Sequence, residues 1–158
     1  MKVIDGGVTA AKGFQAAAAA AGIKYKDRTD MALIYSEKPC KAAGTFTTNL
    51  VKAAPVKWDR AIVESKRKPQ AVIVNSGIAN ACTGAEGMGY CAETAQAASA
   101  ALNVPESAVL VASTGVIGQR LNIECIEEHL PELKLEDNAS EKANRAIMTT
   151  DTKPKTAA

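Results

Sequence analysis

The sequence contains few of the residues on which common catalytic and metal sites depend. Aromatic residues make up 4% of the 158 residues, and the chain has a single histidine, His129. Four cysteines, Cys40, Cys82, Cys91 and Cys125, lie far apart without a CxxC pair. This spacing argues against a zinc site built by this chain alone and predicts free thiols that are buried or half-buried.

The chain also lacks a charge bias and a long apolar run. Lys and Arg number 19 against 17 Asp and Glu, a net charge of +2, which gives no field suited to nucleic acid or an anionic membrane. No apolar stretch approaches the roughly twenty residues that span a bilayer, and residues 1–7 lack the apolar run of a signal peptide. We therefore expect a cytoplasmic protein that binds neither nucleic acid nor membrane.

Motifs for familiar cofactors are absent as well. The sequence has no GxGxxG and no GxxxxGK[ST], so it predicts neither a dinucleotide site nor a P-loop, and we expect no cofactor. His129 falls just before Pro131, in the last turn of an expected helix, where an imidazole commonly interacts with the helix C-terminus. A Ser-His-Asp or Cys-His mechanism is thus left without a convincing base.

Hydrophobic residues form 47% of the chain, enough for a core within one domain spanning 1–158. Apolar runs rich in β-branched residues predict three buried strands, over 31–35, 71–74 and 108–111. A threonine-rich stretch over 43–51 predicts a weaker strand.

Apolar residues at three- and four-residue spacing predict helices over 88–102, 122–130 and 138–148. The order strand, helix, strand between residues 71 and 111 predicts a βαβ unit, and hence an α/β fold. The segment Phe14-Gln15 followed by six alanines has the propensity of a helix, yet Gly13 and Gly22 bracket only about two turns, so its structure stays open.

Two glycine-containing polar loops, 75–84 and 113–118, directly follow predicted strands, where α/β proteins hold their ligands. Ser113-Thr114-Gly115 offers hydroxyls and unobstructed N–H groups that suit an oxyanion or a carboxylate. A turn that needs glycine for its backbone conformation is the alternative. Asn75 and Asn80 carry the same ambiguity, because amide side chains brace loops as often as they bind ligands.

The last candidate segment follows the third predicted helix. Thr149, Thr150, Asp151 and Thr152 offer three hydroxyls and a carboxylate that suit the charged ends of an amino acid. The same residue types also form a capped turn, and the sequence favours neither interpretation.

Six stretches together resemble the glutamate N-acetyltransferase (ornithine acetyltransferase) family, in order and in spacing. They are 6–10, 12–14, 45–56, 75–84, 112–118 and 146–152. The resemblance implies a layered α/β sheet-and-helix sandwich and an enzyme of arginine biosynthesis that moves acetyl from N-acetylornithine to glutamate. Members cleave themselves into α and β chains that assemble as an α2β2 heterotetramer, and a threonine at the new β-chain N-terminus forms the acetyl intermediate with its own amino group as base.

The resemblance also assigns residues. It places the oxyanion hole at Thr114 and Gly115, and a substrate-binding threonine at Thr152, with Thr150 as the second choice of register. Ile78 stands where the family usually has Asn, so this position either lacks a polar contact or faces the core. The family needs no cofactor, although bifunctional members also use acetyl-CoA, and no residue here separates the two kinds.

The chain stops before the family's Lys-Gly-Ser-Gly segment and before its cleavage site. We therefore expect an α-chain portion without its C-terminal end and its β chain, inactive alone. Two alternatives stay open: an α-like domain that only binds a small amino acid or a partner chain, and a self-processing hydrolase of the same fold.

Overall fold

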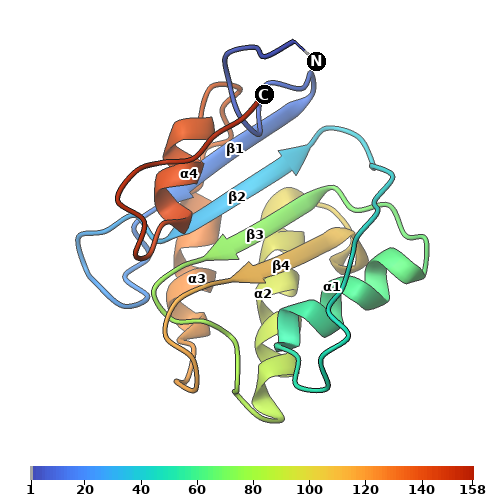
Figure 1. The fold of residues 1–158 in the computed structure, drawn as a ribbon, viewed down its shortest axis with the longest axis vertical. Helices are drawn as coiled ribbons and strands as arrows, with labels where there is room; N and C mark the ends of the chain where they lie inside the picture. Colours follow the sequence, from blue (N-terminus) through green and yellow to red (C-terminus); the bar gives the residue numbers. More distant parts are fainter. Residues whose placement is uncertain (1) are drawn as a thin grey trace.

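The computed structural model describes residues 2–158 and places helices on both faces of one four-stranded sheet (Figure 1). The strands are β1 (Phe14–Ala19), β2 (Met31–Ser36), β3 (Ala71–Asn75) and β4 (Val109–Ser113), in that spatial order. β2 runs antiparallel to β1 and β3, whereas β3 and β4 are parallel. β1, β3 and β4 therefore all end at the same edge of the sheet.

Four α-helices connect or cover the strands. They are α1 (Ala54–Glu64), α2 (Glu86–Leu102), α3 (Ile123–His129) and α4 (Ser140–Ile147), with 3-10 turns at Glu106–Ala108 and Leu130–Glu132. The three predicted strands and the three predicted helices are confirmed, with ends shifted by two residues or fewer. The predicted βαβ unit is β3–α2–β4, and its parallel pairing confirms the α/β class.

The prediction of a strand over 43–51 is wrong, because this segment forms no strand. Its backbone instead bonds to its own side chains: the N–H of Asn49 donates to Thr47 Oγ1 at 3.1 Å, and that of Val51 donates to Asn49 Oδ1 at 3.0 Å. Such local bonds compete with a sheet ladder, and the mostly exposed segment pairs with no strand.

The alanine-rich segment that the sequence left open is strand β1, paired with β2 from Phe14↔Ser36 to Ala19↔Met31. Its small side chains suit a close approach by α4. Ala16 and Ala32 on the sheet are buried against Ala143 and Ala146 of that helix. Tertiary packing of alanine on alanine thus overrides the helix propensity of the segment.

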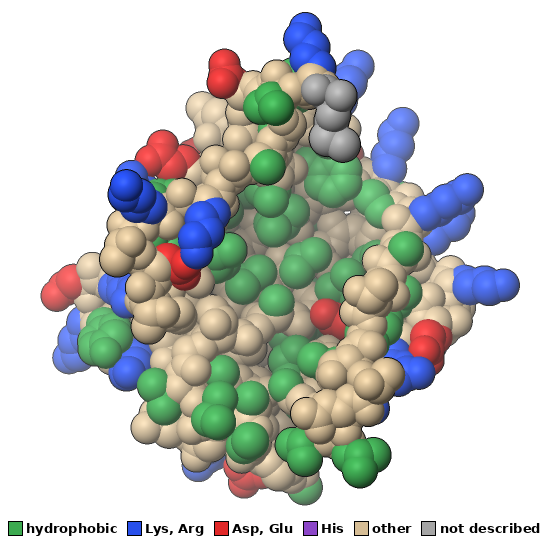
Figure 2. Space-filling model, viewed as in Figure 1, with side chains coloured by type: hydrophobic (Ala, Val, Ile, Leu, Met, Phe, Trp, Pro, Cys, Tyr) green, Lys and Arg blue, Asp and Glu red, His purple; other side chains and the backbone are tan. Residues whose placement is uncertain are grey.

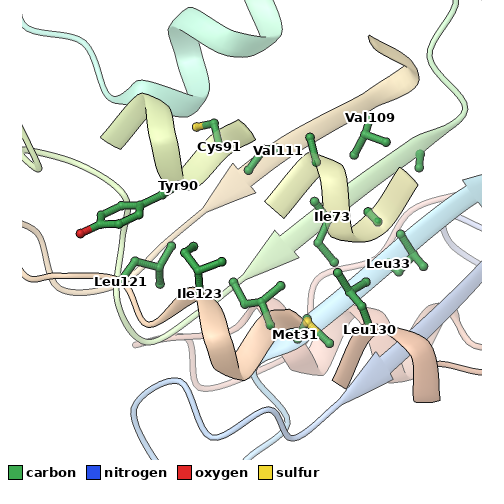
Figure 3. Packing of buried hydrophobic residues seen from close by; sticks show 14 of the residues in the cluster. Met31, Leu33, Ile73, Tyr90, Cys91, Val109, Val111, Leu121, Ile123 and Leu130 are labelled. Atoms are coloured by element: carbon green, nitrogen blue, oxygen red, sulfur yellow. The ribbon is translucent and has the colours of Figure 1, made fainter. Parts of the chain in front are cut away.

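The main core lies on the opposite face, between the sheet and helices α2 and α3 (Figure 3). Side chains from β2, β3 and β4 meet those of the helices and the segments beside them: Met31, Leu33, Ile73, Val109 and Val111 with Cys91, Leu121, Ile123 and Leu130. α1 packs beside α2 and β4 and extends this layer.

The face that carries α4 is covered only in part, since α4 packs mainly on β1 and β2. We call the half-buried residues Ile34, Val72, Val74, Leu110 and Ala112 the open sheet face, because they alternate with the core residues along β2, β3 and β4. Figure 2 shows a hollow with apolar side chains at its centre on this side of the molecule. An apolar sheet face left half-covered is a typical interaction surface.

Candidate functional site: the cleft at the carboxyl edge of the sheet

The two polar loops predicted from the sequence lie side by side, because their strands are parallel neighbours in register Asn75↔Ser113. Backbone bonds join the loops: Thr114 N–H donates to the Asn75 carbonyl at 3.0 Å, and Val116 N–H donates to the Gly77 carbonyl at 3.1 Å. Ala79 N–H returns a bond to the Val116 carbonyl at 2.9 Å. The two loops are therefore held as one rigid unit.

Asn80 and Ser113 brace this unit from inside. Asn80 is 2% exposed, and its backbone N–H donates to Ser113 Oγ at 2.8 Å. Its side chain donates to the Gly87 carbonyl at 2.8 Å and accepts from Thr83 Oγ1 at 2.7 Å. The Asn75 amide likewise donates within the loop, to the Ile78 carbonyl at 2.7 Å. Both asparagines thus act in bracing the loops.

Gly115 occupies a position that no other residue fits. Its φ is +134°, and a Cβ built on it would lie 2.3 Å from both the carbonyl carbon and the oxygen of Gly77. Because these are backbone atoms, they cannot turn aside as a flexible side chain can. Gly115 is therefore required for the close approach of the two loops, and its exposed N–H remains available at the surface.

A cleft of about 430 Å³ opens in front of Thr114 and Gly115. It is lined by Lys24, Tyr25, Arg28, Gly77, Thr114, Gly115, Val116, Thr149 and Thr150. Two of these side chains are cationic and none is a carboxylate. The cleft thus combines donor groups suited to an oxyanion with a positive rim, a composition that favours an anionic ligand.

The structure brings three of the four predicted site residues to this cleft. Thr114, Gly115 and Thr150 line it, whereas Thr152 is exposed and is not among the lining residues that the structure describes. Arg28 fixes the threonine segment, because its guanidinium donates to the carbonyls of Met148 and, at 3.4 Å, Thr149. Of the two threonines that the sequence offered, Thr150 and Thr152, the geometry of the cleft favours Thr150.

The loop between β1 and β2 contributes to the cleft in a way that no sequence motif indicated. Lys24, Tyr25 and Arg28 lie on this loop, which reaches the cleft because β1 is parallel to β3 and β4 and ends at the same edge. The signal was a cluster of charged residues, 24–28, between two strands. It could be used only once the segment before it was known to be a strand.

His129 and Cys91 are not among the residues that line the cleft. His129 Nδ1 pairs with the Cys125 carbonyl at 2.9 Å, in the last turn of α3, where the sequence placed it. Burial, with a contribution from the charge of Asp59, raises the pKa of the Cys91 thiol to about 12, so this cysteine is no nucleophile near neutral pH. The expectation of buried or half-buried thiols is wrong for Cys82, which is exposed.

No three His, Cys, Asp or Glu side chains within residues 2–158 gather as a metal site would require. Within the same range, no helix is long and apolar enough to cross a membrane. Ile78, the residue that departs from the family pattern, packs against the main core, which agrees with the interpretation that this position faces the core.

Comparison with known proteins supports the resemblance drawn from the sequence. A model of the ArgJ family matches residues 15–158. The arginine biosynthesis bifunctional protein ArgJ of Gloeobacter violaceus is 52% identical over 94% of this chain and 37% of its own length, and that of Synechocystis is 46% identical over 99% and 38%. The chain therefore spans well under half the length of these relatives.

Two solved structures share the fold. The crystal structure of ornithine acetyltransferase complexed with ornithine from Mycobacterium tuberculosis has a TM-score of 0.91 and 41% identity, covering 97% of this chain and 84% of that one. The structure of ArgJ from Bacillus halodurans has a TM-score of 0.88 and 40% identity, covering 96% and 81%. The family match over most of the chain and these identities together show that the chain belongs to the ArgJ family.

Proposed function

We propose that this chain supplies the oxyanion hole of an acetyltransferase that moves acetyl from N-acetylornithine to glutamate. The observation that carries the proposal is the cleft in which Thr114 and Gly115 lie beside Thr150. The Thr114 hydroxyl and the Gly115 N–H are the donors for the negative oxygen of the tetrahedral intermediate. Donors of this kind act mainly in the transition state, at which the carbonyl oxygen gains charge.

The reaction divides into two acyl transfers. A threonine hydroxyl attacks the acetyl carbonyl carbon of N-acetylornithine, its proton passes to a base, and the C–N bond breaks as ornithine leaves with a proton. The glutamate amine then attacks the acetyl-threonine ester and releases the threonine hydroxyl. The family resemblance implies that the nucleophile is a threonine at the start of a β chain and that its own amino group is the base. The positions of His129 on α3 and of Cys91, which burial keeps as a thiol, agree with this assignment.

The open sheet face supports a β chain from the same precursor as the partner, in an α2β2 assembly. A layered α/β protein buries both faces of its sheet, yet Ile34, Val72 and Leu110 remain half-buried. The relatives are more than twice as long as this chain, which leaves ample sequence to cover that face. Acetyl-CoA as a second acetyl donor belongs to the same proposal.

The test uses the full-length protein, with residues 1–158 alone as a comparison. We expect the full-length protein to produce ornithine from N-acetylornithine and glutamate, to show a second chain beginning with threonine by intact mass, and the isolated segment to be inactive. Thr114→Ala should lower kcat about 100-fold or more, and Thr114→Ser, which keeps the hydroxyl, should retain most of it. Full transfer by residues 1–158 alone would contradict the assignment of the nucleophile.

A further inference from the structure

The loop that carries Lys24 is fixed rather than free. The Asp30 side chain, 2% exposed, accepts from the backbone N–H of Ala21 at 2.8 Å and of Ile23 at 2.7 Å. Its backbone carbonyl accepts from Ser76 N–H at 2.8 Å, which ties the base of the loop to the end of β3. The backbone that leads into Lys24 is therefore held in place by one buried carboxylate.

Lys24 lies directly beside the oxyanion loops. A Cβ built on Gly77 would meet the Cβ of Lys24 at 3.0 Å, and Gly77 has a φ of +99°. On its other side, Gly77 is in close contact with Gly115. Gly77 thus contacts both Lys24 and Gly115, so only this one glycine separates the lysine from the Gly115 N–H.

The two cations of the cleft are not equivalent. One nitrogen of the Arg28 guanidinium, Nη2, donates to the carbonyls of Met148 and Thr149 and so ties this side chain to the threonine segment. Among residues 2–158 no acidic side chain forms an ion pair with Lys24, whose ammonium instead lies 5.1 Å from the centre of the Tyr25 ring. A lysine amine has three donors, so Lys24 can receive an anion without giving up an ion pair, whereas Arg28 is already bonded to the backbone of the threonine segment.

We propose that Lys24 binds the α-carboxylate of the amino-acid substrate, and this inference rests on the proposed function. N-acetylornithine and glutamate have different side chains, but each carries an α-carboxylate one carbon from the nitrogen that exchanges the acetyl group. A cation beside the oxyanion pair reaches the part that both substrates share. Side-chain recognition then falls to other groups of the site, and Arg28 acts as a positioning residue for Thr149 and Thr150.

The experiment compares Lys24→Met, Lys24→Arg and the control Lys26→Met in the full-length enzyme. Lys26 is exposed on the same loop but does not line the cleft. Each enzyme is assayed with N-acetylornithine and with its α-carboxamide, which lacks the negative charge. We expect Lys24→Met to lower kcat/KM for N-acetylornithine at least tenfold, chiefly through KM, and to change the value for the amide less than twofold. Lys24→Arg should recover part of the loss, and Lys26→Met should match wild type.

The two substrates separate a carboxylate contact from a folding defect, which would lower both values alike. Equal losses on N-acetylornithine and its amide, or no loss on either, would overturn the role of Lys24 while the wild-type activity still stands. If the wild-type enzyme fails to transfer acetyl from N-acetylornithine, the proposed function itself is wrong and the Lys24 assignment falls with it. The failures of the two proposals are thus distinguishable.

Discussion

Replacing Gly115 by alanine tests whether the close approach of the two loops holds the site together. The new Cβ would lie 2.3 Å from the carbonyl group of Gly77, so the loops must move apart by about 1 Å to restore ordinary contact. The movement would stretch the backbone bonds from Thr114 and Val116, each worth about 1 kcal/mol. The φ of +134° adds about 1–3 kcal/mol, so we expect a total loss of about 3–5 kcal/mol.

Gly118→Ala is the matched control for this change. Gly118 also has a positive φ, +72°, but a Cβ there meets nothing within 4 Å, so this variant should lose only about 1–2 kcal/mol. Urea unfolding followed by circular dichroism gives both losses, and hydrogen exchange at the amides of Thr114 and Val116 reports the loops directly. Equal losses in the two variants would refute the role of the Gly115–Gly77 contact.

Three further predictions concern the site and the edge of β4. Burial raises the pKa of Asp59 from 3.8 to about 6, so the folded state binds this proton more tightly than the unfolded state does. Raising the pH from 5 to 8 removes the proton and should lower the unfolding free energy of wild type by about 1 kcal/mol. In the Asp59→Asn variant, the unfolding free energy measured in urea should be the same at pH 5 and pH 8. In the full-length enzyme, Thr150→Ala should raise KM for the amino-acid substrate more than Thr152→Ala, as initial rates would show. Trp58→Phe removes the donor to the Val109 carbonyl and should cost about 1–2 kcal/mol of unfolding free energy in urea.

The sequence predicted strands β2, β3 and β4 and helices α2, α3 and α4, but it left β1 open and missed α1 for identifiable reasons. The segments that form β2, β3 and β4 carry branched apolar residues, which are typical of buried strands, whereas β1 is mostly alanine and owes its conformation to pairing with β2. Helix α1 does have a signal in the sequence. Pro55 stands in its first turn, and Trp58 and Ile62 follow at helical spacing.

The sequence predicted the part of the candidate site that lies directly after the ends of strands. Thr114 and Gly115 could be found because a polar loop that follows a buried strand lies at the carboxyl edge of the sheet. Lys24 could not, since its place in the cleft depends on the direction of β1 and on the loop that Asp30 holds. Neither of these leaves a motif in the sequence.

The two edges of the sheet indicate how the proposed β chain would approach it. Along β4, Trp58 Nε1 donates to the Val109 carbonyl at 3.0 Å, and Asp59 accepts from Val111 N–H at 2.9 Å, so α1 occupies backbone groups that a further strand would need. Along β1, the backbone of Ala16 exchanges two bonds with Glu136, at 3.1 and 2.9 Å.

With both edges occupied in this way, strand addition would first have to break these contacts. The open sheet face needs no such change, because its apolar side chains already lie in a hollow (Figure 2). A partner that packs on Val72 and Leu110 would bury the remaining face of the sheet and leave the loop unit of Gly77 and Gly115 as it is. This geometry favours a partner that completes the layers of the protein over one that extends its sheet.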